Sequence, residues 1–148
     1  MVNVNDVAKW FLSRESITHK KLQKLCYYAQ AWHLALLDEP LFNEEIQAWI
    51  HGPVCPALYR VYSGYRWLEI PKVEETVKFN ERTEELLEAV YSTYGGLTGN
   101  QLERLTHSEK PWQEARGTLQ PFEPCEKVIS FKTMKKYYAE KYEEYQAD

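Results

Sequence analysis

The stretch that most constrains the fold is a helix predicted to begin after Thr18 and to run to about Leu37. Thr18 can cap it, because Ile17 before it and Leu22 at the fourth helical position form the apolar pair that fixes how a chain enters a helix. Apolar side chains cover most of its circumference, so we expect this helix at the centre of the molecule, surrounded by the others. Its main stripe consists of Leu22, Leu25, Cys26, Ala29, Trp32, His33 and Leu36.

Capping residues and prolines mark the starts of most other helices. Asn80 stands where an N-cap is needed, and Thr98 with Gln101 forms a capping box. Pro56 and Pro111 suit a first helical position, because proline lacks the N–H that is unpaired there. The predicted helices are 6–13 (expected to pack over the body as a lid), 56–63, 81–94, 99–107, 111–116 and 131–145 (capped by Ser130, with an aromatic stripe expected to dock on the body).

The β content is expected to be small. Residues 46–50 alternate between apolar and other positions, which predicts a short strand with one buried face. Residues 52–55 are expected to be extended, because two of them precede prolines. Residues 73–79 also alternate and are a candidate second strand that would pair with the first. The sequence therefore predicts a mostly α, compact multi-helix single domain over residues 1–148, with a minor short β element.

Composition and charge argue against several classes of protein. The chain has 148 residues, a formal net charge of -4 and 44% hydrophobic residues, which is ordinary for a globular domain and unlike a dedicated nucleic-acid binder. Basic clusters at 19–24 and 132–136 are interpreted as solvated helix faces. Three cysteines without a close pair indicate reduced thiols in the cytoplasm, and neither a leader nor a membrane span is expected.

No pattern of catalytic residues is evident. The four histidines are too scattered to form a metal-ligand motif, and neither a phosphate-binding loop nor a nucleophile elbow is present. His33, on an apolar helix face, is interpreted as a core residue with satisfied hydrogen bonds. His51 and Cys55 are the one conceivable nucleophilic pair, four residues apart. We therefore expect that the protein is not an enzyme and that it binds neither a cofactor nor a metal ion.

The stretch "AWIHGPVCPALY" combines a Trp, a His and two prolines, and two interpretations stay open for it. In one, Trp49 and His51 lie on the open face of a rigid elbow and form a recognition surface, because stiffness lowers the entropy lost on docking and Trp is an efficient anchor. In the other, the Trp and the turn close the core over the strand. Two interpretations also stay open for Trp112 and Arg116. Either they contribute to the recognition surface, or the indole fills the core and the guanidinium is solvated.

Three segments together resemble the Panacea domain, the antitoxin domain of SocA-like proteins from bacteria and phages. They are "KLQKLCYYAQ" (21–30), "AWIHGPVCPALY" (48–59) and "THSEKPWQEAR" (106–116). The resemblance implies a mainly helical domain without catalysis that neutralises a cognate protein toxin by binding it. Hydropathy and charge separately argue against a membrane and against nucleic acid as partners. Residues predicted to contact the toxin are Trp49, His51, Pro53, Val54, Tyr59, Trp112 and Arg116.

Two other roles remain open at this point. A phage- or prophage-associated regulator would bind operator DNA with the face that carries Lys20, Lys21 and Lys24. A protease adaptor would hand its bound partner to a protease rather than block it.

Overall fold

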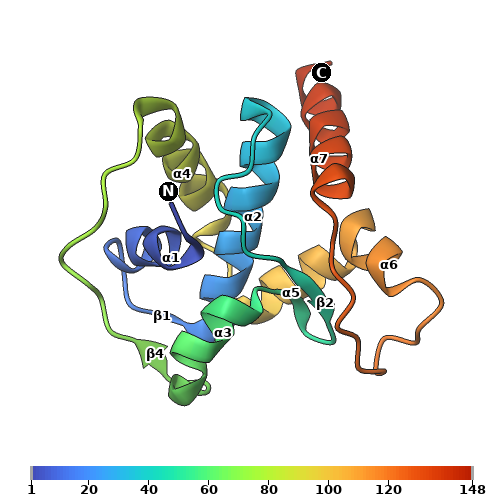
Figure 1. Cartoon of the computed structure of the whole chain (residues 1–148), viewed down its shortest axis with the longest axis horizontal. Coiled ribbons are helices and arrows are strands. Elements are labelled where there is room, and N and C mark those ends of the chain that lie inside the picture. Colours follow the sequence, from blue (N-terminus) through green and yellow to red (C-terminus); the bar gives the residue numbers. More distant parts are fainter. Residues whose placement is uncertain (1, 148) are drawn as a thin grey trace.

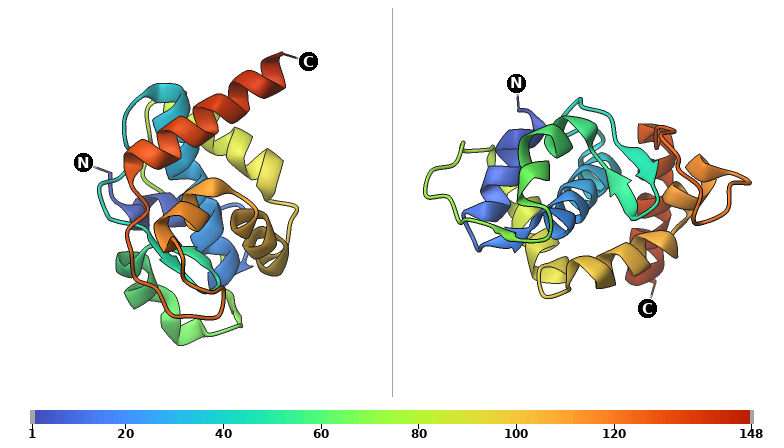
Figure 2. Two further views of the ribbon diagram at one scale, coloured as in Figure 1. Left: turned by 90° about the vertical axis from the view of Figure 1, so that its right-hand side faces the viewer. Right: turned by 90° about the horizontal axis from the view of Figure 1, so that it is seen from below.

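The computed structural model describes residues 2–147, and within them six α-helices are arranged around a central one, with two small two-stranded sheets beside them (Figure 1 and Figure 2). The mostly α fold is therefore confirmed. The helices are α1 (Val4–Leu12), α2 (His19–Leu37), α3 (Pro56–Tyr62), α4 (Glu81–Tyr94), α5 (Gly99–His107), α6 (Lys110–Arg116) and α7 (Phe131–Gln146). The strands are β1 (Ile17–Thr18), β2 (Gln47–Trp49), β3 (Gly52–Val54) and β4 (Glu69–Ile70), and one 3-10 turn, η1, spans Ser63–Tyr65.

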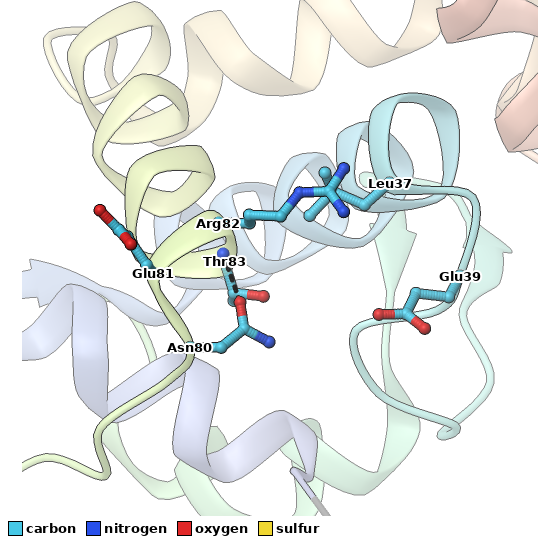
Figure 3. Close-up of a pocket in the computed structure, with 6 residues that line it drawn as sticks. All are labelled: Leu37, Glu39, Asn80, Glu81, Arg82 and Thr83. Atoms are coloured by element: carbon cyan, nitrogen blue, oxygen red, sulfur yellow. Dashed lines mark hydrogen bonds between the residues drawn. The ribbon is translucent and has the colours of Figure 1, made fainter.

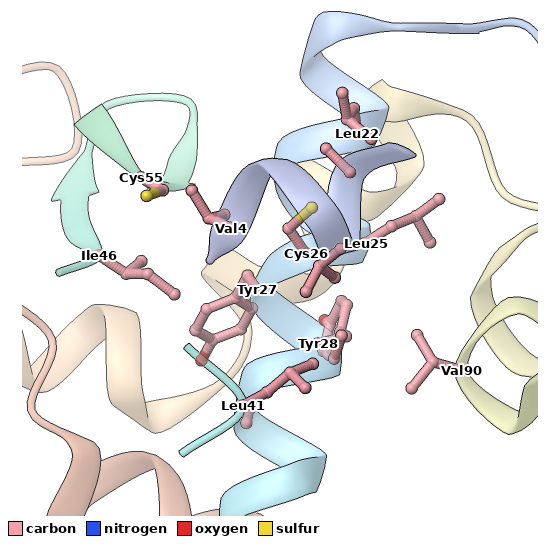
Figure 4. Packing of buried hydrophobic residues seen from close by; sticks show 14 of the residues in the cluster. Val4, Leu22, Leu25, Cys26, Tyr27, Tyr28, Leu41, Ile46, Cys55 and Val90 are labelled. Carbon is pink, nitrogen blue, oxygen red and sulfur yellow. The ribbon is translucent and has the colours of Figure 1, made fainter. Parts of the chain in front are cut away.

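The prediction that α2 is the central helix is confirmed. It packs against α7, α4, α5, α1 and α3, and Thr18 caps it by accepting a hydrogen bond from the Lys21 amide at 3.3 Å. Leu25, Cys26 and Tyr28 are fully buried and form part of one apolar cluster with residues from the surrounding elements (Figure 4). Each large side chain removed from water in this way stabilises the fold by about 1.5–3 kcal/mol.

The capping signals place the helix starts well. Asn80, Thr98 and Ser130 each accept a hydrogen bond from the amide three residues later, as predicted. The first helix begins two residues earlier than predicted, because Asn3 caps it in a reciprocal pair with Asp6. Its apolar side is buried in the core, so it is an integral part of the body rather than a lid. Proline 111 takes the second helical position instead of the first.

The pairing predicted for the first strand is wrong. Strand β2 pairs with β3 in an antiparallel hairpin, in which Trp49 lies opposite Gly52, rather than with residues 73–79. Residues 73–79 form no strand, and their apolar positions Val73 and Phe79 pack against the core directly. The other sheet joins β1 to β4.

A later segment extends the hairpin on its outer edge. The Ala48 amide donates to the Lys127 carbonyl at 2.9 Å, and the Ile129 amide donates to the Ile46 carbonyl at 2.8 Å. Residues 127–129 therefore cover the side of β2 that β3 leaves open. None of the described helices is both long and apolar enough to cross a membrane.

Candidate partner-binding surface

Polar side chains of the central helix fasten the inner strand of the hairpin. The Gln23 side chain accepts from the Cys55 amide at 2.8 Å and donates to the Cys55 carbonyl at 3.3 Å, as a neighbouring strand would. The next residue of the helix, Lys24, donates from Nζ to the Pro53 carbonyl at 3.2 Å, and its whole side chain is buried. Because a buried backbone group without a partner is costly, these contacts fix where β3 lies on α2.

Helix α6 fastens the outer strand. Trp112 Nε1 donates to the Trp49 carbonyl at 2.7 Å, and Arg116 donates to the Ala48 carbonyl at 2.9 Å. The second Arg116 nitrogen donates to the Gln120 and Glu123 carbonyls at 2.8 and 2.5 Å. The guanidinium is 2% exposed and lies over the Trp112 ring, so the interpretation of Arg116 as solvated is wrong, whereas that of Trp112 as a core residue is confirmed.

The turn between the two strands also approaches α2 and α5 closely. Gly52 has a φ of 107°, and a Cβ placed there would lie 2.7 Å from Lys24 Cε and 3.0 Å from Thr106 Oγ1. Beside it, the rings of His107 and Trp112 stack with centroids 3.9 Å apart. The three sequence segments singled out above therefore meet at one place, where they hold the hairpin rigid.

Aromatic rings form a continuous row from the hairpin along α3. Trp49 packs edge-on against Tyr59 with ring centroids 5.0 Å apart, and the buried His19 ring bridges Tyr59 and Tyr62 at 5.2 and 6.3 Å. Tyr65 follows at 6.4 Å from Tyr62. Such spacings are those of interacting rings. We call Trp49, Tyr59, Tyr62 and Tyr65 the aromatic ridge.

The surroundings of the aromatic ridge are exposed and carry positive charge. Trp67 is 76% exposed, Val61 and Leu68 are also largely exposed, and Arg60 and Arg66 lie at the surface. Tyr, Trp and Arg are the residues that most often dominate the binding energy of protein interfaces. Sequence reasoning missed this surface beyond Tyr59, although the stretch "YRVYSGYRW" concentrates three tyrosines, two arginines and a tryptophan in residues 59–67.

Comparison with known proteins decides the family. Residues 22–113 match the model of the family described as "Antitoxin SocA-like, Panacea domain", which is more than half of the chain. The chain belongs to the Panacea domain family. Antitoxin SocA of Caulobacter vibrioides (strain NA1000 / CB15N) is 29% identical over 109 residues, an alignment that covers 65% of this chain and 58% of that relative. This Panacea domain therefore spans less than two thirds of the relative's length. No solved structure matches it.

The predicted contact residues of this Panacea domain divide into two groups. His51, with a side chain 69% exposed, and Tyr59 lie at the surface, and Trp49 is half-buried between Tyr59 and Gln47. Pro53 and Val54 are buried residues of strand β3 itself, and Trp112 and Arg116 are buried residues of α6 that hold the hairpin from behind. A partner can therefore contact His51, Tyr59 and part of Trp49 directly. The buried residues affect binding mainly by fixing the conformation of the hairpin.

A shallow pocket adjoins the exposed face of the hairpin. It has a volume of about 300 Å³ and is lined by Trp49, Ile50, His51, Val54 and residues 124–126. His51 Nδ1 lies 3.2 Å from Glu103 Oε2 of α5, which orients the imidazole at the rim. The hairpin thus offers a hollow beside a ridge, a shape that a protruding side chain of a partner can fill.

Polar side chains around a second hollow serve the fold instead. This hollow of about 270 Å³ lies where α4 begins, and in it Asn80 Oδ1 accepts from the Thr83 amide at 2.9 Å (Figure 3). Behind it, His33 Nε2 lies 3.0 Å from Thr83 Oγ1 and Nδ1 lies 2.7 Å from the Glu39 carbonyl oxygen. The interpretation of His33 as a satisfied core residue is therefore confirmed.

The lysines that were candidates for DNA contact are engaged within the chain. Lys20 Nζ lies 2.6 Å from a Glu103 carboxylate oxygen, and Lys21 Nζ donates to the Gly95 carbonyl at 2.6 Å. Lys24 is buried under the hairpin. The face that carries these three lysines is therefore not the solvated basic surface that phosphate binding needs.

The conceivable nucleophilic pair has the wrong surroundings for that chemistry. Cys55 is buried, and this burial raises the pKa of its thiol, whereas His51 is exposed and interacts with Glu103. A reactive thiol needs the opposite, a lowered pKa and access. Among the described residues, no group of three or more His, Cys, Asp or Glu side chains could hold a metal ion.

Burial of Lys24 predicts a pH-dependent stability. Desolvation, together with the charge of Lys20 and against that of Glu103, lowers the pKa of Lys24 from 10.5 to about 7. Between these values the unfolded chain binds more protons, so stability rises with pH and is lost as pH falls. When the pH is raised from 7 to about 8.5, we expect the free energy of unfolding to increase by about 1.5 kcal/mol more in the wild type than in Lys24→Met, which lacks the titrating group. Urea unfolding at the two pH values measures this difference; an equal pH dependence in both proteins contradicts it.

Proposed function

We propose that this Panacea domain is an antitoxin that neutralises a cognate protein toxin by direct binding, with the aromatic ridge and His51 as its contact surface. The observation that carries the proposal is the partly exposed row of aromatic rings that runs from a hairpin fastened from both sides along α3 to η1. The family supports a toxin partner in general, since a relative is itself named an antitoxin.

Rigidity and composition both favour this surface. A loop already held in one conformation loses little entropy on docking, so more of the contact energy appears as affinity. The carbonyls of Ala48, Trp49 and Pro53 are all held by buried side chains, which leaves the exposed side of the hairpin preformed. Arg60 and Arg66 beside the ridge favour a toxin surface that offers carboxylates.

The compartment follows from the thiols. Cys26, Cys55 and Cys125 are all buried and free, which suits a reducing environment. We therefore place the neutralisation in the cytoplasm, where no catalysis and no cofactor are required of the antitoxin.

The double substitution His51→Ala with Tyr59→Ala tests the contact surface. Both side chains lie at the surface, but Tyr59 also packs on the Trp49 and His19 rings, so we expect the melting temperature to fall by no more than about 5 °C. Loss of two interface side chains is expected to weaken toxin binding by about 100-fold and to abolish growth rescue when the variant is co-expressed with the toxic product of the neighbouring gene. Calorimetric titration and colony counts measure the two effects.

A matched control separates contact from general surface changes. Phe122→Ala with Lys132→Ala removes another exposed aromatic and another exposed polar side chain, both outside the ridge, and we expect it to keep full rescue. Unchanged affinity in the His51 and Tyr59 variant would place the toxin elsewhere. A neighbouring gene product that is harmless and does not bind would refute the antitoxin function itself.

A further inference from the structure

A large groove lies on the other part of the molecule, between α4 and α7. Its volume is about 650 Å³, and the C-terminal part of α2 also lines it. We call it the α4–α7 groove; it shares no residue with the aromatic ridge. The side chains that determine its character are mostly apolar or aromatic: Trp32, Leu36, Val90, Tyr94, Tyr142 and Tyr145.

In this groove, the apolar stripes predicted for two helices, α2 and α7, are not covered by other described parts of the chain. Leu36 belongs to the main stripe of α2 and is 42% exposed, although residues 22–34 of that helix are all buried. The prediction that the aromatic stripe of α7 docks on the body holds for Met134 and Tyr138, which are buried, and is wrong for Tyr142 and Tyr145, which stay exposed. The stripes of α2 and α7 thus open into one space that no described residue fills.

A buried carboxylate with one free oxygen borders this groove. Glu109 is 2% exposed, and its Oε1 accepts from the Tyr28 and Tyr138 hydroxyls at 2.7 and 2.8 Å. Its Oε2 is buried and has no hydrogen-bond partner among the described residues. Lys141 Nζ is 3.8 Å away, which is beyond hydrogen-bond distance. Since buried polar atoms in native structures are nearly always hydrogen-bonded, Oε2 is an acceptor that lacks its donor.

The charge around Oε2 selects the kind of donor. Lys141 already supplies a positive charge close to the carboxylate, so a second ammonium would be repelled by it. An uncharged N–H or O–H completes the hydrogen bonds of Oε2 and leaves that ion pair in place. Trp32, Tyr94 and Tyr142 line the groove, so an aromatic ligand can make edge-on or stacked contacts with their rings.

We propose that the α4–α7 groove binds a small uncharged aromatic molecule whose N–H or O–H donates a hydrogen bond to Glu109 Oε2. The volume lies in the range of small-molecule sites, which are mainly apolar with a few placed polar groups. Such a site gives the domain a ligand of its own, on a surface separate from the one assigned to the toxin.

Indole and 1-methylindole are a matched pair of probes for this site, because only indole carries the N–H. Both are titrated into the purified full chain by NMR at about pH 8, since burial raises the pKa of Glu109 and the acceptor must be ionised. A hydrogen bond to a charged acceptor predicts that indole binds about tenfold more tightly than 1-methylindole. Chemical-shift changes are expected at Trp32, Val90 and Tyr142.

Three variants locate the effect. Glu109→Gln is expected to bring the two probes to within about twofold of each other, because the amide oxygen takes the two tyrosine hydroxyls and an NH₂ group then faces the groove. Ala89→Trp, at an exposed position in the groove wall, is expected to abolish binding of both probes. Glu85→Gln changes an exposed carboxylate at the rim and is the control that keeps wild-type binding.

Several results would overturn the proposal. These are equal affinity of the wild type for the two probes, no binding of either up to its solubility limit, and indole binding that Glu109→Gln and Ala89→Trp leave unchanged. Loss of toxin neutralisation in Ala89→Trp would also overturn it, by making the groove part of the toxin interface. Retained neutralisation in Ala89→Trp, with indole binding lost, supports two independent sites.

Discussion

Replacing Arg116 with alanine is expected to lower the free energy of unfolding by about 3 kcal/mol. The guanidinium lies 2% exposed among the carbonyls of Ala48, Gln120 and Glu123, all within 2.9 Å of its nitrogens. Truncation leaves these acceptors without their donor and opens a cavity beside Trp112, over whose ring the guanidinium lies. Urea unfolding monitored by circular dichroism measures the loss.

Two substitutions show whether the loss comes from this geometry. Arg116→Lys keeps the charge but not the planar fork, so it is expected to recover less than half of the stability. Arg104→Ala removes an exposed arginine of α5 and is expected to cost less than about 0.5 kcal/mol. Cleavage by trypsin within residues 117–129 should quicken in Arg116→Ala before global unfolding does. A cost for Arg116→Ala no larger than that for Arg104→Ala would mean that the carbonyls find water instead.

The helices could be predicted because the signals that place them are local. Thr18, Asn80, Thr98 and Ser130 each cap within three residues of their own position, so the sequence around them is sufficient. Strand pairing depends on contacts between distant residues, and there the prediction was wrong. In residues 73–79 only Val73 and Phe79 touch the core and Val77 is exposed, so the alternation of the sequence marks neither a buried face nor a partner strand.

The sequence indicated which segments form the candidate surface, but not which of their side chains are buried and which are exposed. The resemblance led to three segments that the structure brings together, in which Trp112 and Arg116 fasten the hairpin while His51 and Tyr59 are exposed. Nothing in the sequence distinguishes a buried arginine held by carbonyls from a solvated one, because its acceptors belong to the backbone. Glu109 carries no motif either, and its two tyrosine donors come from different helices.

Replacing Gly52 with alanine is the second change with a large expected effect, a loss of about 3 kcal/mol in unfolding free energy. A φ of 107° is strained for any residue with a Cβ, and the new methyl group would lie 2.7 Å from Lys24 Cε and 3.0 Å from Thr106 Oγ1. Lys24 is fully buried, so it has little room to withdraw. Chemical unfolding measures the loss, and toxin neutralisation should fall only in proportion to the unfolded fraction.

Two other glycines separate backbone strain from close approach. Gly117 has a φ of 61° and a ψ of -121° with open space around its position, so Gly117→Ala carries the backbone strain alone, at a cost of about 1–3 kcal/mol. Gly64 has open space and no positive φ, and Gly64→Ala is expected to be neutral or slightly stabilising. In the Gly52→Ala background, Lys24→Ala should then lower the free energy of unfolding by less than it does in the wild type, because it removes the side chain with which the new methyl group collides. If Gly52→Ala costs no more than Gly117→Ala, the close approach contributes nothing, and the hairpin is held on α2 by the hydrogen bonds of Gln23 and Lys24 alone.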